Sequence, residues 1–136
     1  MADAREAASV AVQTALVDVL SGIGVAVFTV MPQAVDGGSD AVFPHIHIDE
    51  PILGSFDTMT GDGHDIIQRI HVRWRGGSNL PGKRLQAEIY DLLHHGTLVM
   101  EGWTLILMAQ DQVFVTRMPD GSFDGINEFR LIVQKT

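Results

Sequence analysis

Hydrophobic and polar side chains alternate most regularly between Ile66 and Arg75. Apolar side chains fall on one side of this segment and basic ones on the other, which is the period-two pattern of a strand with one buried face. The apolar side holds Ile66, Ile70, Val72 and Trp74, and the opposite side holds Arg69, His71, Arg73 and Arg75. We therefore predict a strand whose basic face meets either water or a partner.

Other stretches rich in β-branched and aromatic residues predict further strands. They lie at Val25–Val30, Val42–Ile48, 52–58, Thr104–Arg117 and Ile126–Gln134. In the second of these stretches, His45, His47 and Asp49 should share one side of the strand, opposite Ile46 and Ile48. The last two stretches are separated by Met118–Ser122, and the Asp-Gly pair within it is typical of a hairpin.

Two segments, Ala4–Leu20 and Leu80–His95, have apolar residues at helical spacing. The buried positions are expected to be Ala8, Val12, Ala15, Leu16 and Val19 in the first, and Leu85, Ile89, Leu92 and Leu93 in the second. We expect Gly22, in a left-handed conformation, and Gly96 to end these helices. A polar loop is predicted over 36–40.

This order of elements predicts an α+β fold, with a mostly antiparallel sheet packed with two helices and closed by a long β-hairpin. We see neither a linker nor an internal repeat, and we expect a single domain over residues 1–136. A chain of this length can bury one core without disulfides or metals.

Composition narrows the functional classes. The chain has no cysteine, which excludes disulfides and thiolate metal sites. Its formal net charge of −8 argues against nonspecific binding of nucleic acid, which needs a basic surface. No apolar run approaches the roughly 20 residues that span a bilayer, and the N-terminus lacks the basic region of a signal peptide. We expect an acidic protein made in the cytoplasm.

The segment Gly77–Lys83 matches most of a phosphate-binding loop, because Gly77, Gly82 and Lys83 have the spacing G-x-x-x-x-G-K. However, Arg84 follows where such loops place the Ser or Thr that binds magnesium, and arginine cannot be a metal ligand. We therefore interpret this segment as a turn, with Ser78 or Asn79 capping a helix and Pro81 in its first turn. The nucleotide interpretation predicts that ATP binds; ours predicts that it does not.

Catalysis and metal binding have weaker support. His45, His47 and Asp49 could form half of a metal site, but no third or fourth ligand follows at a characteristic distance. There is neither a cysteine nucleophile nor a Gly-x-Ser-x-Gly motif. We expect no enzyme activity, no cofactor and no bound metal.

The order of segments resembles one virus family. The segments are "VMPQAVDG…AVFPHIHIDE", "IIQRIHVRWRGG", "GKRLQAEIYDLLHHGTLVMEGW" and "TRMPDGSFDGINEFRLIV". They are similar to tail terminator proteins, also called tail completion or tail-to-head joining proteins, of long-tailed bacteriophages and phage-like gene transfer agents. The likeness extends from Ala8 to Val133 and rests on a pattern: Pro44 before a strand, Trp74 at the end of one, a small element at Leu98–Gly102 and Pro-Asp-Gly before the last strand.

This resemblance implies a structural virion protein at the head-proximal end of the tail. Such proteins form a homo-oligomeric ring, usually a hexamer, which caps the tail tube, stops its polymerisation and joins the tail to the head connector or stopper protein. DNA would pass through the lumen without specific binding. The same segments leave open a head-completion or neck protein of the same particle and, further away, a small metal-binding or phosphate-binding enzyme domain.

A ring forms by head-to-tail contacts that close by rotation, and the basic row on the Ile66–Arg75 strand could meet acidic patches of a neighbouring subunit. Exposed charges contribute little to stability, so we expect Arg69 and Arg73 to be replaceable without loss of the fold. The candidate interface residues are Arg69, Arg73, Arg75, Lys83, Arg84 and Asp120.

Overall fold

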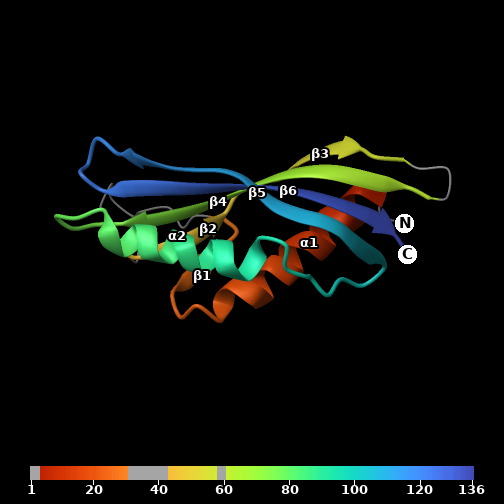
Figure 1. The fold of residues 1–136 in the computed structure, drawn as a ribbon, viewed down its shortest axis with the longest axis horizontal. Coiled ribbons are helices and arrows are strands. Elements are labelled where there is room, and N and C mark those ends of the chain that lie inside the picture. The colour runs from red at the N-terminus through yellow and green to blue at the C-terminus, as the bar shows by residue number, and fades with distance from the viewer. Residues whose placement is uncertain (1–3, 31–42, 58–60) are drawn as a thin grey trace.

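The computed structural model describes residues 4–30, 43–57 and 61–136. Within them, one sheet has the strand order β1-β2-β4-β6-β5, and β3 pairs with β4 beside β2 (Figure 1). All pairings are antiparallel except that of β1 with β2. The strands are β1 Ala26–Phe28, β2 His45–Ile48, β3 Ile52–Ser55, β4 Gly63–Trp74, β5 Trp103–Arg117 and β6 Phe123–Lys135. The predicted mostly antiparallel α+β fold is confirmed.

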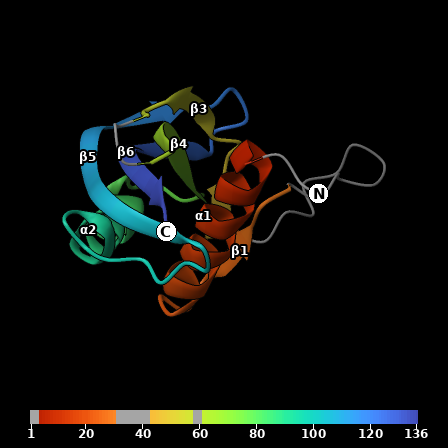
Figure 2. The same cartoon turned by 90° about the vertical axis from the view of Figure 1, so that its right-hand side faces the viewer.

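Both helices, α1 Ala4–Ser21 and α2 Leu80–Leu93, lie against the same face of the sheet (Figure 2). The first packs on β1 and β2, and the second on β4, β5 and β6. This leaves the opposite face, which we call the outer face, without a covering helix. The two-layer arrangement buries the apolar side of each strand between sheet and helices.

The core between the layers contains the apolar side chains that the alternation of the sequence indicated. From β4 come Ile66, Ile70, Val72 and Trp74; from α1 come Ala8, Val12, Ala15, Leu16 and Leu20; from α2 come Ile89 and Leu93. Trp103 is also buried, and it pairs with Lys135 at the opposite end of β6 from Phe123, the partner of Trp74. The basic residues of β4 project onto the outer face, as their alternation with the apolar residues requires.

Three expectations about the helices are wrong. The left-handed residue after α1 is Gly24, with φ of 98°, and not Gly22. Two tight hydrogen bonds, from the N–H groups of Gly22 and Ile23 to carbonyls three residues earlier, extend the turn before the chain reverses. After α2 the left-handed residue is His95, one position before Gly96. Leu92, expected in the core, is 43% exposed, whereas Leu93, also expected there, is buried.

The strands differ from their predicted bounds mainly at their ends. Both β4 and β6 begin three residues before the predicted starts at Ile66 and Ile126, because they pair with each other over their whole length. The strand β1 has only three residues, since its partner β2 is itself short. The predicted hairpin at Met118–Ser122 is confirmed, and Gly121 adopts the positive φ of 87° that the turn needs. The predicted loop over 36–40 and the start of the strand at Val42 lie outside the described residues.

Candidate functional site

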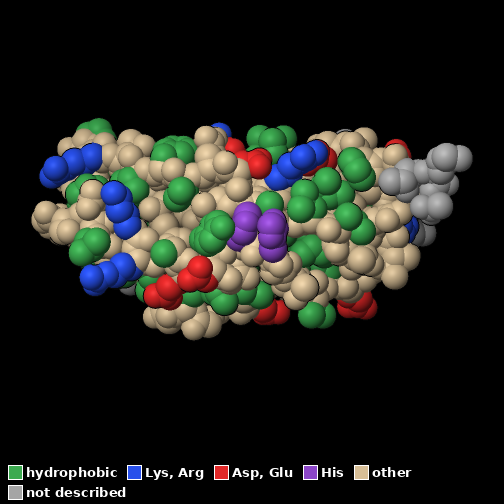
Figure 3. All heavy atoms as spheres, viewed as in Figure 1, with side chains coloured by type: hydrophobic (Ala, Val, Ile, Leu, Met, Phe, Trp, Pro, Cys, Tyr) green, Lys and Arg blue, Asp and Glu red, His purple; other side chains and the backbone are tan. Residues whose placement is uncertain are grey.

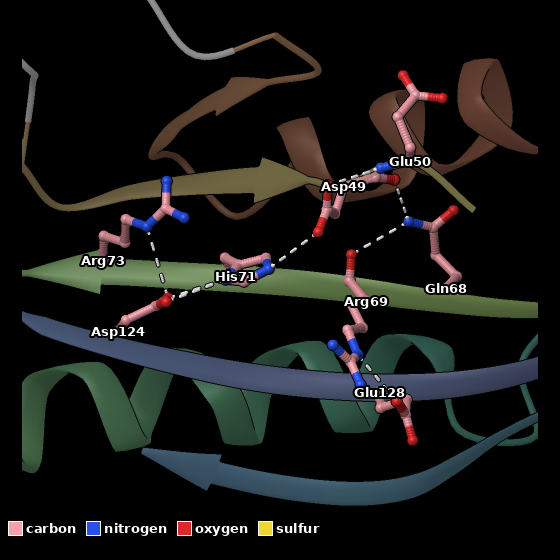
Figure 4. A network of polar contacts seen from close by, with 8 residues as sticks. All are labelled: Asp49, Glu50, Gln68, Arg69, His71, Arg73, Asp124 and Glu128. Atoms are coloured by element: carbon pink, nitrogen blue, oxygen red, sulfur yellow. Dashed lines mark hydrogen bonds and ion pairs between the residues drawn. The ribbon is translucent and has the colours of Figure 1, made fainter. Parts of the chain in front are cut away.

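The outer face carries a row of charged residues from three adjacent strands. Antiparallel register sets His47 of β2 beside His71 of β4, and Arg73 of β4 beside Asp124 of β6. Arg69 lies beside Glu128 in the same way. Arg69, His71 and Arg73 therefore each meet an acid of β6. Figure 4 shows Arg69, His71 and Arg73 along β4, with Asp49, Asp124 and Glu128 beside them.

His71 is at the centre of this network. Its Nδ1 lies 3.0 Å from Oδ1 of Asp124, and its Nε2 lies 3.4 Å from Oδ2 of Asp49. Nε of Arg73 lies 3.5 Å from the same Asp124 oxygen (Figure 4). The side chains of His71 and Asp124 are only 11% and 10% exposed. When both ring nitrogens carry a proton, His71 donates to two carboxylates, so this network bridges β2, β4 and β6.

Burial lowers the pKa of His47, and the nearby Arg73 guanidinium lowers it further. Asp49, at the end of β2, has its pKa pushed up by burial, but a hydrogen bond from the Glu50 backbone N–H and the nearby His71 outweigh that effect. The pKa of Asp49 consequently stays below its ordinary value. The outer face thus favours neutral His47 beside a charged Asp49.

Two further ion pairs flank the centre. Nε of Arg69 donates to Glu128 at 2.9 Å, and the Gln112 side chain donates to the other Glu128 oxygen at 2.8 Å. Arg130 binds Asp65 through two nitrogens, the closer at 2.7 Å, and this fork lowers the pKa of Asp65. In both pairs the arginine is about half exposed, although Glu128 and Asp65 are only 12% and 30% exposed. An exposed partner limits such a pair to about 1 kcal/mol of stability.

The remaining candidate interface residues lie at the end where β4 stops. Arg75 and Asp120 are 3.7 Å apart, and Ser122 holds Asp120 through its backbone N–H and its hydroxyl. Those hydrogen bonds from Ser122 lower the pKa of Asp120. Lys83 and Arg84 are exposed on the first turns of α2. The structure therefore places Arg75 beside Asp120 and Arg73 beside Asp124. That these residues contact a neighbouring subunit stays a prediction.

The segment that resembled a phosphate loop has a structural explanation. β4, which leads into it, pairs antiparallel with both of its neighbours, whereas phosphate loops follow a strand of a parallel sheet. Gly82 lies directly under the Trp74 ring, where a Cβ atom would clash. The hydroxyl of Ser78 accepts a hydrogen bond from the Leu80 N–H, and Pro81 stands in the first turn. The glycine at this position makes room for tryptophan.

The histidines of β2 do not gather further ligands. His45 is buried between the rings of Phe28 and Phe43, and His47 lies with its ring 5.6 Å from that of His71. Within the described residues, no group of three His, Asp or Glu side chains is arranged to hold a metal ion.

A groove that sequence reasoning missed lies between α2 and the second half of β5. It has a volume of about 770 Å³. Its walls include Tyr90, Val113 and Phe114, and Lys83 and Arg117 lie at the end near the start of α2. No pattern in the sequence predicts that α2 lies beside β5. The only signal for the groove was the presence of apolar residues late in β5, which the structure leaves exposed.

No helix within the described ranges has the length and hydropathy to cross a membrane.

Comparisons with known proteins establish the fold. No family model matches the chain, and no curated protein matches it in sequence. Among solved structures, the fold is similar to that of a chain described as "Virion of native gene transfer agent (GTA) particle". The TM-score is 0.72, the alignment covers 93% of each chain, and the sequence identity is 20%. The two helices and the largely antiparallel sheet described above are therefore a fold that a gene transfer agent virion also contains.

Proposed function

We propose that this protein is a structural component of a phage-like virion, and that it forms the ring that caps the tail tube and joins the tail to the head. The observation that carries the proposal is the likeness in fold to a chain of a gene transfer agent virion over 93% of both chains. The order of sequence segments, which resembles tail terminator proteins, supports the finer role. A second copy of this chain, the tail tube protein and the head connector are the partners.

The outer face suits a structural role better than catalysis. Its charged side chains satisfy one another through ion pairs across three strands, with Asp124 and Glu128 each holding an arginine. A catalytic acid or base must lie within hydrogen-bonding reach of a substrate, whereas His71 is only 11% exposed and both of its ring nitrogens already face carboxylates. The His71 network instead ties β2, β4 and β6 into one stiff sheet. A stiff sheet with a patterned surface is what repeated contacts around a ring require.

A head-completion protein of the same particle is the second candidate, because such a protein is also a ring component of a virion. Deletion of the gene in particle-producing cells separates the two functions. A tail terminator predicts tubes of uncontrolled length and heads without tails under the electron microscope. A head-completion protein predicts tails of normal length beside heads that fail to retain DNA.

In solution the proposal predicts a closed oligomer. Sedimentation velocity and electron microscopy of the purified protein should show rings, alone or after addition of the tail tube protein. A chain that remains a monomer at every concentration and in the presence of the tube protein would contradict the ring.

A further inference from the structure

The charges of the molecule are unevenly distributed along its longest axis. The end at which β4 stops, α2 starts and the β5–β6 hairpin turns has five of the nine Lys and Arg side chains. They are Arg73, Arg75, Lys83, Arg84 and Arg117. The described acidic side chains at this end, Asp120 and Asp124, are already in ion pairs. Figure 3 shows Lys and Arg side chains gathered at this end of the visible face. A chain of net charge −8 therefore has one basic end.

The groove between α2 and β5 opens at this basic end. Among described residues, neither Lys83 nor Arg117 has an acidic partner within ion-pair distance, although the Arg117 guanidinium lies over the Phe123 ring at 5.3 Å. Val113 and Phe114 are 48% and 40% exposed. The groove thus combines apolar walls with two cations at one end. The third charged residue in its lining, Asp91, belongs to a later turn of α2.

β5 is also an edge strand along this groove, where the Phe114 carbonyl accepts a hydrogen bond from the Gln86 side chain and the Gln110 N–H donates to Nδ1 of His94. It is the last strand in the order of the sheet, and within the described part of the chain its pairing partner is β6. An edge strand beside a groove can receive an extended segment by strand addition, in which backbone hydrogen bonds supply affinity and side chains supply specificity.

A segment of matching character lies toward the other end of the molecule. Residues 97–101 connect α2 to β5 without regular secondary structure (Figure 1). Val99 in this segment is 96% exposed, and Glu101 is exposed two residues later. Glu101 has no ion pair with a described residue. An apolar side chain followed at this spacing by an acid is complementary to a groove with apolar walls and a basic end.

We infer that the groove between α2 and β5 binds residues 97–101 of a neighbouring copy of this chain, with Val99 on the apolar walls and Glu101 against Lys83 and Arg117. The contact joins two different surfaces, so its repetition builds a ring when the rotation between copies closes, rather than a two-fold dimer. The inference rests on the proposed ring and names the surfaces that meet in it. Groove and segment lie toward opposite ends of the molecule, so one copy can use both at once (Figure 1).

The test is a reciprocal charge exchange. Lys83→Glu and Glu101→Lys should each weaken self-association by about tenfold or more, because each places like charges together at every junction. The double variant should return to within about threefold of the parent protein. A mixture of the two single variants should also associate, since alternating copies place opposite charges at every junction. Sedimentation velocity measures association, and circular dichroism verifies that each variant is folded.

Glu88→Lys is the matched control for charge reversal, because Glu88 is exposed on the same helix as Lys83 but does not line the groove. It should change association little. If the parent protein forms rings but the double variant and the mixture stay as weak as the single variants, the assigned contact is wrong and the ring stands. If Lys83→Glu leaves association intact but weakens binding to a duplex DNA probe, the basic end is an anion site and the contact is again wrong. If the parent protein never associates, the proposed function and the inference fail together.

Discussion

Trp74 holds together three parts of the fold. Its ring stacks on Phe123 with centroids 5.2 Å apart, packs over Gly82 of α2, and donates from Nε1 to the Ser78 carbonyl at 3.2 Å. The side chain is 2% exposed. One residue therefore links the ends of β4 and β6 to the start of α2, which is also the basic end of the molecule.

Replacement of Trp74 by alanine should destabilise the protein by roughly 3 to 5 kcal/mol, the range for loss of a large buried aromatic side chain. Leu92→Ala is the control, because that side chain is 43% exposed and should cost less than about 1 kcal/mol. Urea unfolding of both variants measures the difference. Equal losses in the two variants would mean that Trp74 is not a core anchor.

His47 makes stability depend on pH. Its pKa is lowered in the folded protein from the ordinary 6.5, mainly by burial and next by Arg73; Asp49 opposes this, while His71 and His45 add to it. The unfolded chain therefore takes up a proton more readily than the folded one. The lowered pKa of His47 does not change the free energy of unfolding above pH 6.5. As the pH falls from 6.5 through the folded pKa, it destabilises the folded protein.

His47→Gln removes this titration. Between about pH 7.5 and pH 5, the free energy of unfolding should fall less steeply for the variant than for the parent protein. The range stays above the ordinary Asp pKa of 3.8, so the carboxylates Asp49 and Asp65 contribute little to the slope. Denaturant unfolding at several pH values supplies the slopes. Parallel curves for the two proteins would show that folding does not perturb His47.

At the scale of elements, β4 decides what the outer face can do. Its arginines differ in burial: the Arg69 side chain is 50% exposed, whereas that of Arg73 is 26% exposed and pairs with Asp124 at 10%. Sequence reasoning treated both as replaceable surface charges. For Arg73 that expectation does not fit the structure, because its side chain is about half as exposed as that of Arg69 and its partner Asp124 also holds His71. The acids do not differ in this way, since Glu128 and Asp124 are 12% and 10% exposed.

We expect Arg69→Glu to cost less than about 1 kcal/mol, as for other exposed pairs. Arg73→Glu should cost roughly 1 to 3 kcal/mol, since it places a second carboxylate beside Asp124; its partial exposure keeps the loss below that of a fully buried pair. Thermal or urea unfolding compares the two. If Arg73→Glu is as mild as Arg69→Glu, the central network is only a surface pair.

This difference also determines how the candidate interface can be tested. A reversal at Arg73 would confuse loss of fold with loss of assembly, whereas Arg69→Glu should leave a folded chain whose association can be measured directly. Reduced association of that variant would support Arg69 as an interface residue. Unchanged rings would mean that Arg69 serves only the ion pair with Glu128.

At the scale of the whole molecule, two properties support an assembly role. The helices cover one face of the sheet and leave the other patterned with paired charges (Figures 2 and 4). Three cations without an acidic partner among the described residues, Lys83, Arg84 and Arg117, lie at one end of the molecule, beside a groove and an edge strand. A molecule with one basic end and an acidic remainder has unlike surfaces, and contacts between unlike surfaces are those that build rings.

The sequence by itself determined the elements and their faces. Alternation in β4 and helical spacing in α1 are local properties of the backbone, so Ile70, Val72 and Ala8 could be assigned to the core without knowledge of the fold. The antiparallel hairpin was also predictable, because Pro-Asp-Gly makes a turn wherever two strands flank it. Helix ends were less so, since His95 rather than Gly96 takes the left-handed position.

Only the tertiary structure decided which charges meet. Asp124 binds Arg73 and His71 because the register of β6 on β4 places them side by side, and that register depends on pairing along the whole of both strands. Gly82 is a second example. Its spacing in the sequence suggested a phosphate-binding loop, whereas in the structure it packs against the ring of Trp74. The groove exists because α2 lies apart from the end of β5. Contacts between residues distant in the chain depend on how elements pack, and no local pattern of residues encodes that packing.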